Sequence, residues 1–502
     1  MTVGIMEGQR EVVLSCPKGL TIRLSGPAES RIDIPAGHRI RLSGFGQEPG
    51  ETRFRIVLTG LRGGNLEAIA SVRRTWGDRD VSVEEISIGG IVGFPSRVLD
   101  NRRSLLVTTD VYASREEAQL AARALAEKWK LQSEPRVFGQ PKKRSKGTVL
   151  ATDMNSGLVI RQADLMAFVG ADSHPITVEQ VEFGKGYAHH GFEDRRFRGE
   201  ILVAIDSMGR LAVVNRLSAE HVLQGIVPSE IFPTAPAAAL EAQAIAARSE
   251  LFAKIGIRNL ADPFLVCATQ RCQVYGGIDK ETEATNKAVQ RTRGKMLFDS
   301  KEHLVDAVYS ASSGGHTESN EHVWEGTPNP TLRGVFDGRT SVAPWKSGSI
   351  PTEGQLLKFL DDPPWTYAGN TTKGRKVFRW VKTLPVKELT NMVNTRHAIG
   401  EVVGIDVLER GVSGRGKTVR FRGTRGEAVV KGELRIRRLL GNMRSTMFVT
   451  SKRDGYWFFK GGGWGHGVGM CQYGAIGMAE AGKTATQILT KYFSETKVRS
   501  VY

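Results

Sequence analysis

The stretch IVPSEIFPTAPAAALEAQAIAARSELFAK, residues 226–254, sets a lone carboxylate, Glu230, just ahead of a proline-rich turn and an alanine-rich segment. Pro236 suits the first turn of a helix, where the N–H that proline lacks would have no partner within the helix. We therefore predict a helix from about residue 236 to residue 255. Because most of its side chains are small, this helix can pack closely against a sheet or a second helix.

Two interpretations of Glu230 follow from its neighbours. Apolar residues such as Ile226 and Phe232 disfavour an ionised carboxylate and raise its pKa, which suits a general acid. The positive end of the following helix would lower that pKa instead. The sequence does not weigh the two effects, so Glu230 is either a general acid or an exposed acid that favours the helix start.

The predicted helix also places Glu241, Ala244 and Arg248 on one stripe, because they follow a spacing of three and four residues. Arg248 is either a functional cation or one half of a structural salt bridge. Glu241 and Glu250 are the two acidic residues that could complete such a bridge.

Length and charge limit the class of protein. The chain has 502 residues, too many for one ordinary domain, so two to four units are expected. Its net charge of +17 favours polyanions: nucleic acid, anionic lipid or a carboxylate-rich cell-wall polymer. The basic residues are spread along the chain without an RNA-binding aromatic signature, so we expect no nucleic-acid partner.

No run of 18 apolar residues is present, and no membrane-spanning segment is expected. The start, MTVGIMEGQREVV, lacks a basic head followed by an apolar block. The protein therefore either stays inside the cell or has lost a leader peptide.

The order of predicted elements indicates an α+β, multi-module fold. Residues 1–60 predict short strands, and residues 198–217 predict a β-hairpin with a glycine turn. Residues 103–129 predict a strand followed by a helix that begins with a capping box of Ser114 and Glu117. The C-terminal third predicts strands and a closing helix after Thr484, where Gln487 completes a second capping box.

Two loops could carry binding groups. The first, YSASSGGHTESNEHVWEG (309–326), offers many hydrogen-bond donors and acceptors, and Trp324 could stack on a pyranose ring; otherwise it is a solvated loop. Its histidines, His316 and His322, lack a recognised zinc spacing. The second, KGGGWGHGVGMCQYGA (460–475), has no βαβ context, which argues against a dinucleotide site. It displays Trp464, His466 and Tyr473, or serves packing alone.

Taken in order, the blocks HVLQGIVPSEIFPTAPAAALEAQAIAARS, CATQRCQVYGG, YSASSGGHTESNEHVW and GGGWGHGVGMCQYGA resemble the SpoIID/LytB family of peptidoglycan-acting proteins. The resemblance covers roughly residues 195–502. It implies that Glu230 is the catalytic acid of a lytic transglycosylase acting on glycan strands stripped of stem peptides. The substrate-binding residues that it implies are Arg248, Gln243, Thr317, Asn320, His466 and Tyr473.

This sequence departs from the family pattern at several positions. Glu241 replaces a lysine, and Val222 replaces a tyrosine. Some members bind zinc near the block that holds Cys267 and Cys272, but here Arg271 stands where a histidine is often found. We expect the two cysteines to lie close together, with a disulfide favoured over zinc. No metal and no cofactor are predicted.

The predicted domains are a β-rich module (1–87), a strand–helix segment resembling a SPOR-type glycan-binding repeat (88–137), a basic linker or loop (138–150) and a SpoIID/LytB-like catalytic domain (151–502). An extracytoplasmic location, in the periplasm or cell envelope, is expected. The expected partners are peptidoglycan glycan strands and a cell-wall amidase.

Three activities remain open from the sequence. In the first, Glu230 alone acts as acid and then base in a transglycosylase whose cleft also holds Arg248, Thr317 and Asn320. In the second, as in LytB-type members, the chain binds peptidoglycan and enhances a separate amidase without catalysis. In the third, Glu230 and Glu318 form the carboxyl pair of a glycosidase, which requires a separation of about 5 to 9.5 Å.

Overall fold

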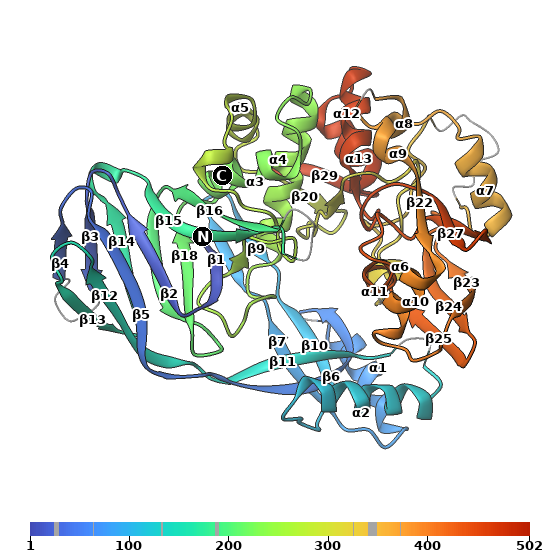
Figure 1. The fold of residues 1–502 in the computed structure, drawn as a ribbon, viewed down its shortest axis with the longest axis horizontal. Helices are drawn as coiled ribbons and strands as arrows, with labels where there is room; N and C mark the ends of the chain where they lie inside the picture. The colour runs from blue at the N-terminus through green and yellow to red at the C-terminus, as the bar shows by residue number, and fades with distance from the viewer. Residues whose placement is uncertain are drawn as a thin grey trace. The chain divides into compact units, whose positions relative to one another are not determined.

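The computed structural model of the protein describes residues 1–24, 30–63, 65–131, 134–185, 190–324, 326–339, 349–371 and 373–502. The chain divides into two compact units. Unit 1 comprises Met1–Glu230, Leu251–Arg293 and Val501–Tyr502, and unit 2 comprises Ile231–Glu250 and Gly294–Ser500. Both contain helices and sheets, which confirms the predicted α+β class (Figure 1). Among the described residues, no helix is long and apolar enough to cross a membrane.

Unit 1 is built mainly from two large sheets. The first has seven strands, in the order β19 (Val266–Cys267), β1 (Thr2–Gln9), β18 (Leu211–Arg216), β17 (Glu200–Ile205), β14 (Leu165–Gly170), β3 (Leu20–Leu24) and β4 (Ser30–Ile34). The second has six, in the order β13 (Val159–Ala163), β12 (Lys146–Asp153), β5 (Arg39–Glu48), β2 (Glu11–Ser15), β15 (Ile176–Phe183) and β16 (Gly191–Phe197). The predicted N-terminal strands and the antiparallel β17–β18 hairpin are confirmed.

A smaller sheet in unit 1 carries two helices. Its strands follow the order β11 (Arg136–Lys143), β6 (Glu51–Arg62), β10 (Arg103–Thr108) and β7 (Val83–Ile88). Helices α1 (Leu66–Gly77) and α2 (Arg115–Lys128) lie along this sheet (Figure 1). The predicted capping box of Ser114 and Glu117 is present at the start of α2. The chain order is therefore β-α-β-β-α-β, with the hairpin β8 (Ile91–Phe94) and β9 (Arg97–Asp100) inserted between β7 and β10.

The basic segment 138–150, which we expected to form a linker or loop, consists largely of strands β11 and β12. Strand β11 pairs with β6 and β12 pairs with β5, so these residues are held by long antiparallel ladders. β11 lies at the edge of its sheet, where Pro141 and exposed lysines are tolerated because one side of the strand needs no partner.

Glu230 is the last residue of one helix and precedes the next. The segment SAEHVLQGIVP, which the sequence predicts as a short helix ending near Gly225 and Pro228, is instead part of helix α3 (Ala219–Glu230), which continues past Pro228. Ser229 Oγ donates to Gly225 O at 2.8 Å within the last turn. The next helix, α4 (Ala237–Ala253), matches the predicted range of about 236–255. Nearly all of α4 is buried, as expected for a helix that is apolar on every side.

Shorter elements complete unit 1. They are η1 (Ala171–Ser173), η2 (Ile278–Lys280) and α5 (Glu283–Arg291). The last two residues of the sequence also belong to this unit. The Tyr502 ring stacks on Phe94 of β8 with centroids 4.9 Å apart, and its hydroxyl donates to Glu220 of α3 at 2.5 Å.

Unit 2 has small sheets and short helices. Its strands pair as β20 (Lys295–Asp299) with β29 (Thr496–Ser500), β21 (Tyr309–Ser310) with β28 (Met470–Cys471), β22 (Arg379–Pro385)–β27 (Tyr456–Gly462)–β26 (Phe448–Arg453), and β23 (Val402–Arg410)–β24 (Gly416–Gly423)–β25 (Gly426–Lys431). Its helices after α4 are α6 (Glu321–Trp324), α7 (Glu353–Asp361), α8 (Tyr367–Asn370), α9 (Arg375–Phe378), α10 (Val386–Asn394), α11 (Glu433–Leu439), α12 (Gln472–Glu480) and α13 (Ala485–Tyr492). The capping box of Thr484 and Gln487 opens α13 as predicted.

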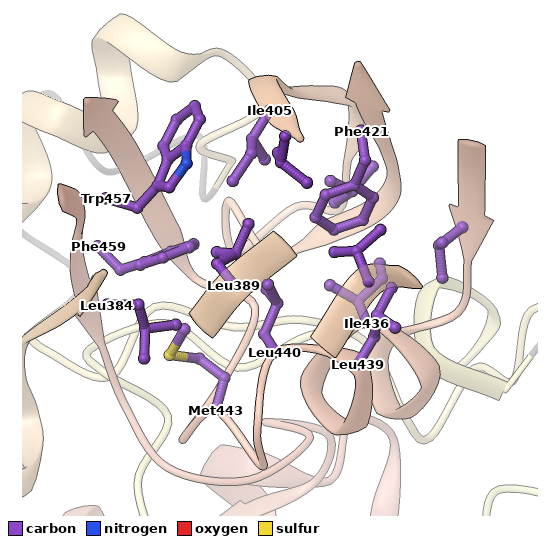
Figure 2. Packing of buried hydrophobic residues seen from close by; sticks show 14 of the residues in the cluster. Leu384, Leu389, Ile405, Phe421, Ile436, Leu439, Leu440, Met443, Trp457 and Phe459 are labelled. Carbon is purple, nitrogen blue, oxygen red and sulfur yellow. The ribbon is translucent and has the colours of Figure 1, made fainter. Parts of the chain in front are cut away.

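One apolar core of unit 2 lies between its two three-stranded sheets and helices α10 and α11. Figure 2 shows Leu389 of α10 and Ile436 of α11 pointing into the cluster that also contains Phe421, Trp457 and Phe459. These side chains are at least nine-tenths buried, so the strands predicted in the C-terminal third form a true core.

The two compact units divide the chain differently from the predicted domains, whose boundaries at residues 87, 137 and 150 stay a prediction. Residues 1–230 lie in one unit, and the predicted catalytic domain is shared between both. Each unit is assembled from segments that are distant in sequence.

Candidate active site

The Glu230 carboxylate lies at the C-terminal end of α3, where the backbone N–H of Val274 donates to Oε1 at 2.6 Å. Burial raises the pKa of Glu230 to about 7, although the Val274 N–H and the charge of Lys254 act in the opposite direction. A carboxyl with this pKa is partly protonated near neutral pH and can donate a proton. Of the two effects left open by the sequence, burial therefore prevails.

The segment 267–276 that supplies the Val274 N–H is tied to α3. Gly276 N donates to Gly225 O at 3.2 Å, and the Tyr275 hydroxyl donates to Asn215 Oδ1 at 2.7 Å. A Cβ on Gly225 would lie 2.4 Å from the Tyr275 ring, so glycine is needed for this approach. The same helix thus carries Glu230 and positions its hydrogen-bond donor.

The two nearby cysteines lie together, as expected. The Sγ atoms of Cys267 and Cys272 are 3.1 Å apart, and both side chains are buried free thiols. The hydrogen bond between the sulfurs lowers the pKa of Cys267. No group of three or more His, Cys, Asp or Glu residues suited to a metal occurs in the described parts of the chain. Oxidation to a disulfide, in preference to zinc binding, stays a prediction.

Arg248 and Gln243 are both fully buried on α4. Arg248 Nη1 donates to Lys295 O at 3.2 Å, and so ties α4 to the start of β20. Gln243 Oε1 accepts from Gln472 Nε2 of α12 at 3.2 Å. These contacts give both residues a structural role within unit 2, beside the substrate-binding role implied by the family.

Thr317 and Asn320 lie in the polar loop, the segment 309–326 quoted in the sequence analysis. Thr317 Oγ1 accepts from Val335 N at 2.7 Å, and its side chain is fully buried. Asn320 Oδ1 accepts from Asn329 N at 2.8 Å and from Arg333 Nη2 at 2.7 Å. Both side chains therefore shape the loop between residues 317 and 335.

His466 and Tyr473 lie in different surroundings. The His466 ring contacts the Trp324 ring with centroids 4.8 Å apart, and its Nδ1 accepts from Val468 N at 3.0 Å. Tyr473 is nearly buried, and its ring lies 5.8 Å from that of Phe232. The structure thus joins the two sequence loops at Trp324 and His466.

Glu318 is the most completely bonded carboxylate of the polar loop, and it is fully buried. Its oxygens accept from the backbone N–H groups of Ser319, Val412 and Ser413, and from the Ser413 hydroxyl at 2.6 Å. His322 Nδ1 lies 2.9 Å from Oε1. Burial opposes ionisation, but these bonds and the charge of Arg415 prevail and lower the pKa of Glu318. Such a carboxylate is a fixed anion.

Comparison with known proteins bears on this site. Residues 207–298 match the family model described as stage II sporulation protein, and these residues include Glu230. This match and the relatives named below support the resemblance to the SpoIID/LytB family. Residues 318–469 match a second model, a domain of unknown function.

Three relatives show the extent of this similarity. An uncharacterized protein of Brachyspira hyodysenteriae is 29% identical over 351 residues, or 69% of this chain and 81% of the relative. The amidase enhancer of Bacillus subtilis is 29% identical over 304 residues, or 55% of this chain and 40% of the enhancer. Stage II sporulation protein D of Bacillus subtilis is 29% identical over 303 residues, or 57% of this chain and 75% of the relative.

Glu230 lies in unit 1, whereas all the predicted substrate-binding residues lie in unit 2. Their convergence on one cleft stays a prediction. The pairing of Glu318 with His322 was missed in the sequence. The four-residue spacing is visible there, but α6 begins only at Glu321, so helical periodicity gave no signal.

Proposed function

We propose that this SpoIID/LytB protein is a peptidoglycan lytic transglycosylase in which Glu230 is the general acid and then the base. The observation that carries the proposal is a partly buried carboxyl at the end of α3 whose pKa is raised to about 7 by desolvation. An ordinary exposed glutamate would be almost fully ionised at neutral pH and would have no proton to donate.

The reaction needs one carboxyl. Protonated Glu230 donates its proton to the glycosidic oxygen between N-acetylmuramic acid and N-acetylglucosamine. The C1–O bond breaks through an oxocarbenium-like state. The 6-hydroxyl oxygen of the same muramic acid attacks C1, and ionised Glu230 takes the proton of that hydroxyl. The products are a 1,6-anhydro end and a free 4-hydroxyl, and Glu230 is protonated again.

The positive charge of the chain fits such a substrate. Glycan strands stripped of stem peptides carry the carboxylates of muramic acid, and a net charge of +17 attracts them over a distance of about 8 Å at physiological salt. Glu318 is unsuited to be a second catalytic carboxyl, because its oxygens already accept bonds from several donors. A mechanism without a second carboxyl agrees with this.

The test is cleavage of denuded glycan strands, followed by mass spectrometry of the ends. We expect 1,6-anhydro ends from the wild type. Glu230→Gln should lower the rate about 10²- to 10⁴-fold, because the amide cannot supply a proton, yet should still bind strands. Glu220→Gln, on the same helix α3, is the matched control and should cleave normally. Reducing ends would instead identify a hydrolase, and an unchanged rate in Glu230→Gln would exclude Glu230 as the acid.

A second candidate is a non-catalytic amidase enhancer. The relative from Bacillus subtilis that bears this name favours it, since it aligns with 55% of this chain. This candidate predicts that wild type and Glu230→Gln both bind peptidoglycan, that neither cleaves it, and that both accelerate a cell-wall amidase equally.

A further inference from the structure

Two thiols lie in the segment of unit 1 that supplies the hydrogen-bond donor of Glu230. The Sγ atoms of Cys267 and Cys272 are 3.1 Å apart, and the two residues are only 2% and 5% exposed. In a disulfide the sulfurs are about 2.05 Å apart, so a movement of about 1 Å would let these thiols join. The proposed reaction uses neither thiol, so the pair is free to have another role.

Cys267 is the more reactive of the two thiols. The hydrogen bond between the sulfurs lowers the pKa of Cys267 and raises that of Cys272. The Thr269 hydroxyl, whose oxygen lies 3.3 Å from Cys267 Sγ, and the Arg271 guanidinium also lower the pKa of Cys267. Glu7 lies 3.7 Å from the same guanidinium. Since the thiolate is the nucleophilic form, an oxidant reacts first at Cys267.

Burial decides which oxidants reach the pair. A disulfide reagent has to bring its own sulfur into line with the thiolate, whereas hydrogen peroxide is about the size of two water molecules. The Cys267 thiolate attacks one peroxide oxygen, the O–O bond breaks and hydroxide leaves, which gives a sulfenic acid. The Cys272 sulfur then attacks the Cys267 sulfur, and its proton leaves with the sulfenic oxygen as water. The two thiols lose two electrons, and the peroxide gains them.

Cys267 is anchored and Cys272 is not. Cys267 ends β19, which pairs with β1 at Gly4, and Ala268 N donates to Gly4 O at 2.9 Å. Cys272 lies in the loop that follows, outside any strand. When the two sulfurs approach each other, most of the movement therefore falls on the Cys272 side of the loop.

Two contacts connect Cys272 to Glu230. Val274, two residues after Cys272, donates its N–H to Glu230 Oε1 at 2.6 Å. The Cys272 carbonyl accepts from Lys254 Nζ at 3.0 Å. The Val274 N–H and the Lys254 charge both favour the ionised form of Glu230, in opposition to burial. A displacement of Cys272 thus disturbs both groups that stabilise the carboxylate.

We infer that Cys267 and Cys272 form a peroxide-sensitive dithiol whose oxidation weakens the support that Val274 and Lys254 give to ionised Glu230. The carboxyl then keeps its proton to higher pH, so hydrogen peroxide regulates the group that the proposed function makes the acid. The change in ionisation is argued from unit 1 alone, whereas its effect on glycan cleavage rests on the proposed function.

The test compares the full-length protein, reduced with a phosphine, with the same protein after treatment with hydrogen peroxide. Mass spectrometry should show the loss of two hydrogen atoms, mapped to Cys267 and Cys272. The infrared band of the protonated carboxyl, taken as wild type minus Glu230→Gln, reports the ionisation of Glu230. We expect peroxide to raise the pH midpoint of this band by at least about half a unit, and a dithiol reductant to reverse the shift. The alkaline limb of the cleavage rate should move in the same direction.

Two variants control for other effects of peroxide. Cys267→Ser lacks the reactive sulfur, so peroxide should leave its Glu230 band unchanged. Cys16→Ser removes another buried free thiol of unit 1 and should respond to peroxide like the wild type.

Two results with the wild type would overturn the inference. One is the absence of a disulfide between Cys267 and Cys272 after peroxide treatment of the folded protein. The other is a disulfide that forms but leaves the pH midpoint of Glu230 unchanged. Failure of the proposed function is a separate result, since the Glu230 band would then shift with peroxide while neither form of the protein produces anhydro ends.

Discussion

Two carboxyls of this protein, Glu230, which is partly buried, and Glu318, which is fully buried, behave in opposite ways. Burial raises the pKa of Glu230 to about 7, whereas hydrogen bonds to Glu318 lower its pKa despite complete burial. Glu230 accepts from the Val274 N–H, while the Glu318 oxygens accept from three backbone N–H groups, a serine hydroxyl and a histidine. Burial alone therefore does not decide ionisation; the supply of donors does.

The largest effect on stability should come from Glu318→Gln. The amide fits the space, but its NH₂ group would face donors such as Ser413 N, and the charge beside Arg415 would be lost. We expect a loss of about 3 to 5 kcal/mol in the free energy of unfolding at neutral pH, measured with chemical denaturant. Glu283→Gln, an exposed site, is the control. A loss below about 1 kcal/mol would show that the Glu318 bonds do not hold the loop.

The second largest effect concerns the pH dependence of protein stability, which should differ in sign between Glu230 and Glu318. The folded pKa of Glu230, about 7, exceeds the unfolded value of 4.5, so its contribution to stability is full below pH 4.5 and is lost as pH rises through 7. Glu230→Gln does not titrate. Its stability relative to wild type should therefore increase by up to about 3 kcal/mol between pH 4 and pH 8. Parallel stability curves for the two proteins would contradict the raised pKa.

For Glu318 the stability contribution changes with pH in the opposite direction. Because its folded pKa is lowered, its contribution is present above the unfolded value of 4.5 and is lost as pH falls through the folded pKa. The stability difference between wild type and Glu318→Gln should thus shrink on acidification below pH 4.5. A difference that stays constant down to pH 2 would contradict the lowered pKa of Glu318.

The smallest effect should come from Lys254→Met. The Lys254 charge lowers the pKa of Glu230, and its Nζ donates to Cys272 O at 3.0 Å. Without it, the pKa of Glu230 should rise, and the alkaline limb of the cleavage rate should move to higher pH. The lost hydrogen bond should cost about 1 kcal/mol of stability. Lys287→Met, on the exposed face of α5, should leave the pH profile unchanged; an equal shift there would indicate a general charge effect.

Local signals in the sequence predicted much of the fold. The capping residues Ser114 and Thr484 marked the starts of α2 and α13, and Pro236 marked the start of α4. Such signals work because each element satisfies its first N–H groups with side chains close in sequence. Local signals did not predict the strands of segment 138–150, because these strands are stabilised by partners far away in the chain.

The site was harder to predict for the same reason. The residues that fix Glu318, Val412 and Ser413, lie 94 and 95 positions away, and Val274, which donates to Glu230, lies 44 positions away. A sequence motif identified Glu230 as the candidate catalytic acid. Its ionisation depends on burial and on donors brought together by folding, which no local pattern encodes.

The segmented make-up of unit 1 has a consequence for synthesis. This unit includes residues 251–293 and Val501–Tyr502, and Tyr502 stacks on Phe94. A ribosome at about 5 to 20 residues per second would deliver that tyrosine more than about 20 seconds after Phe94. Throughout this interval the face of Phe94 that Tyr502 later covers would be exposed to other nascent chains. A cell that makes this protein quickly would therefore benefit from a chaperone that shields this strand until Tyr502 has been made.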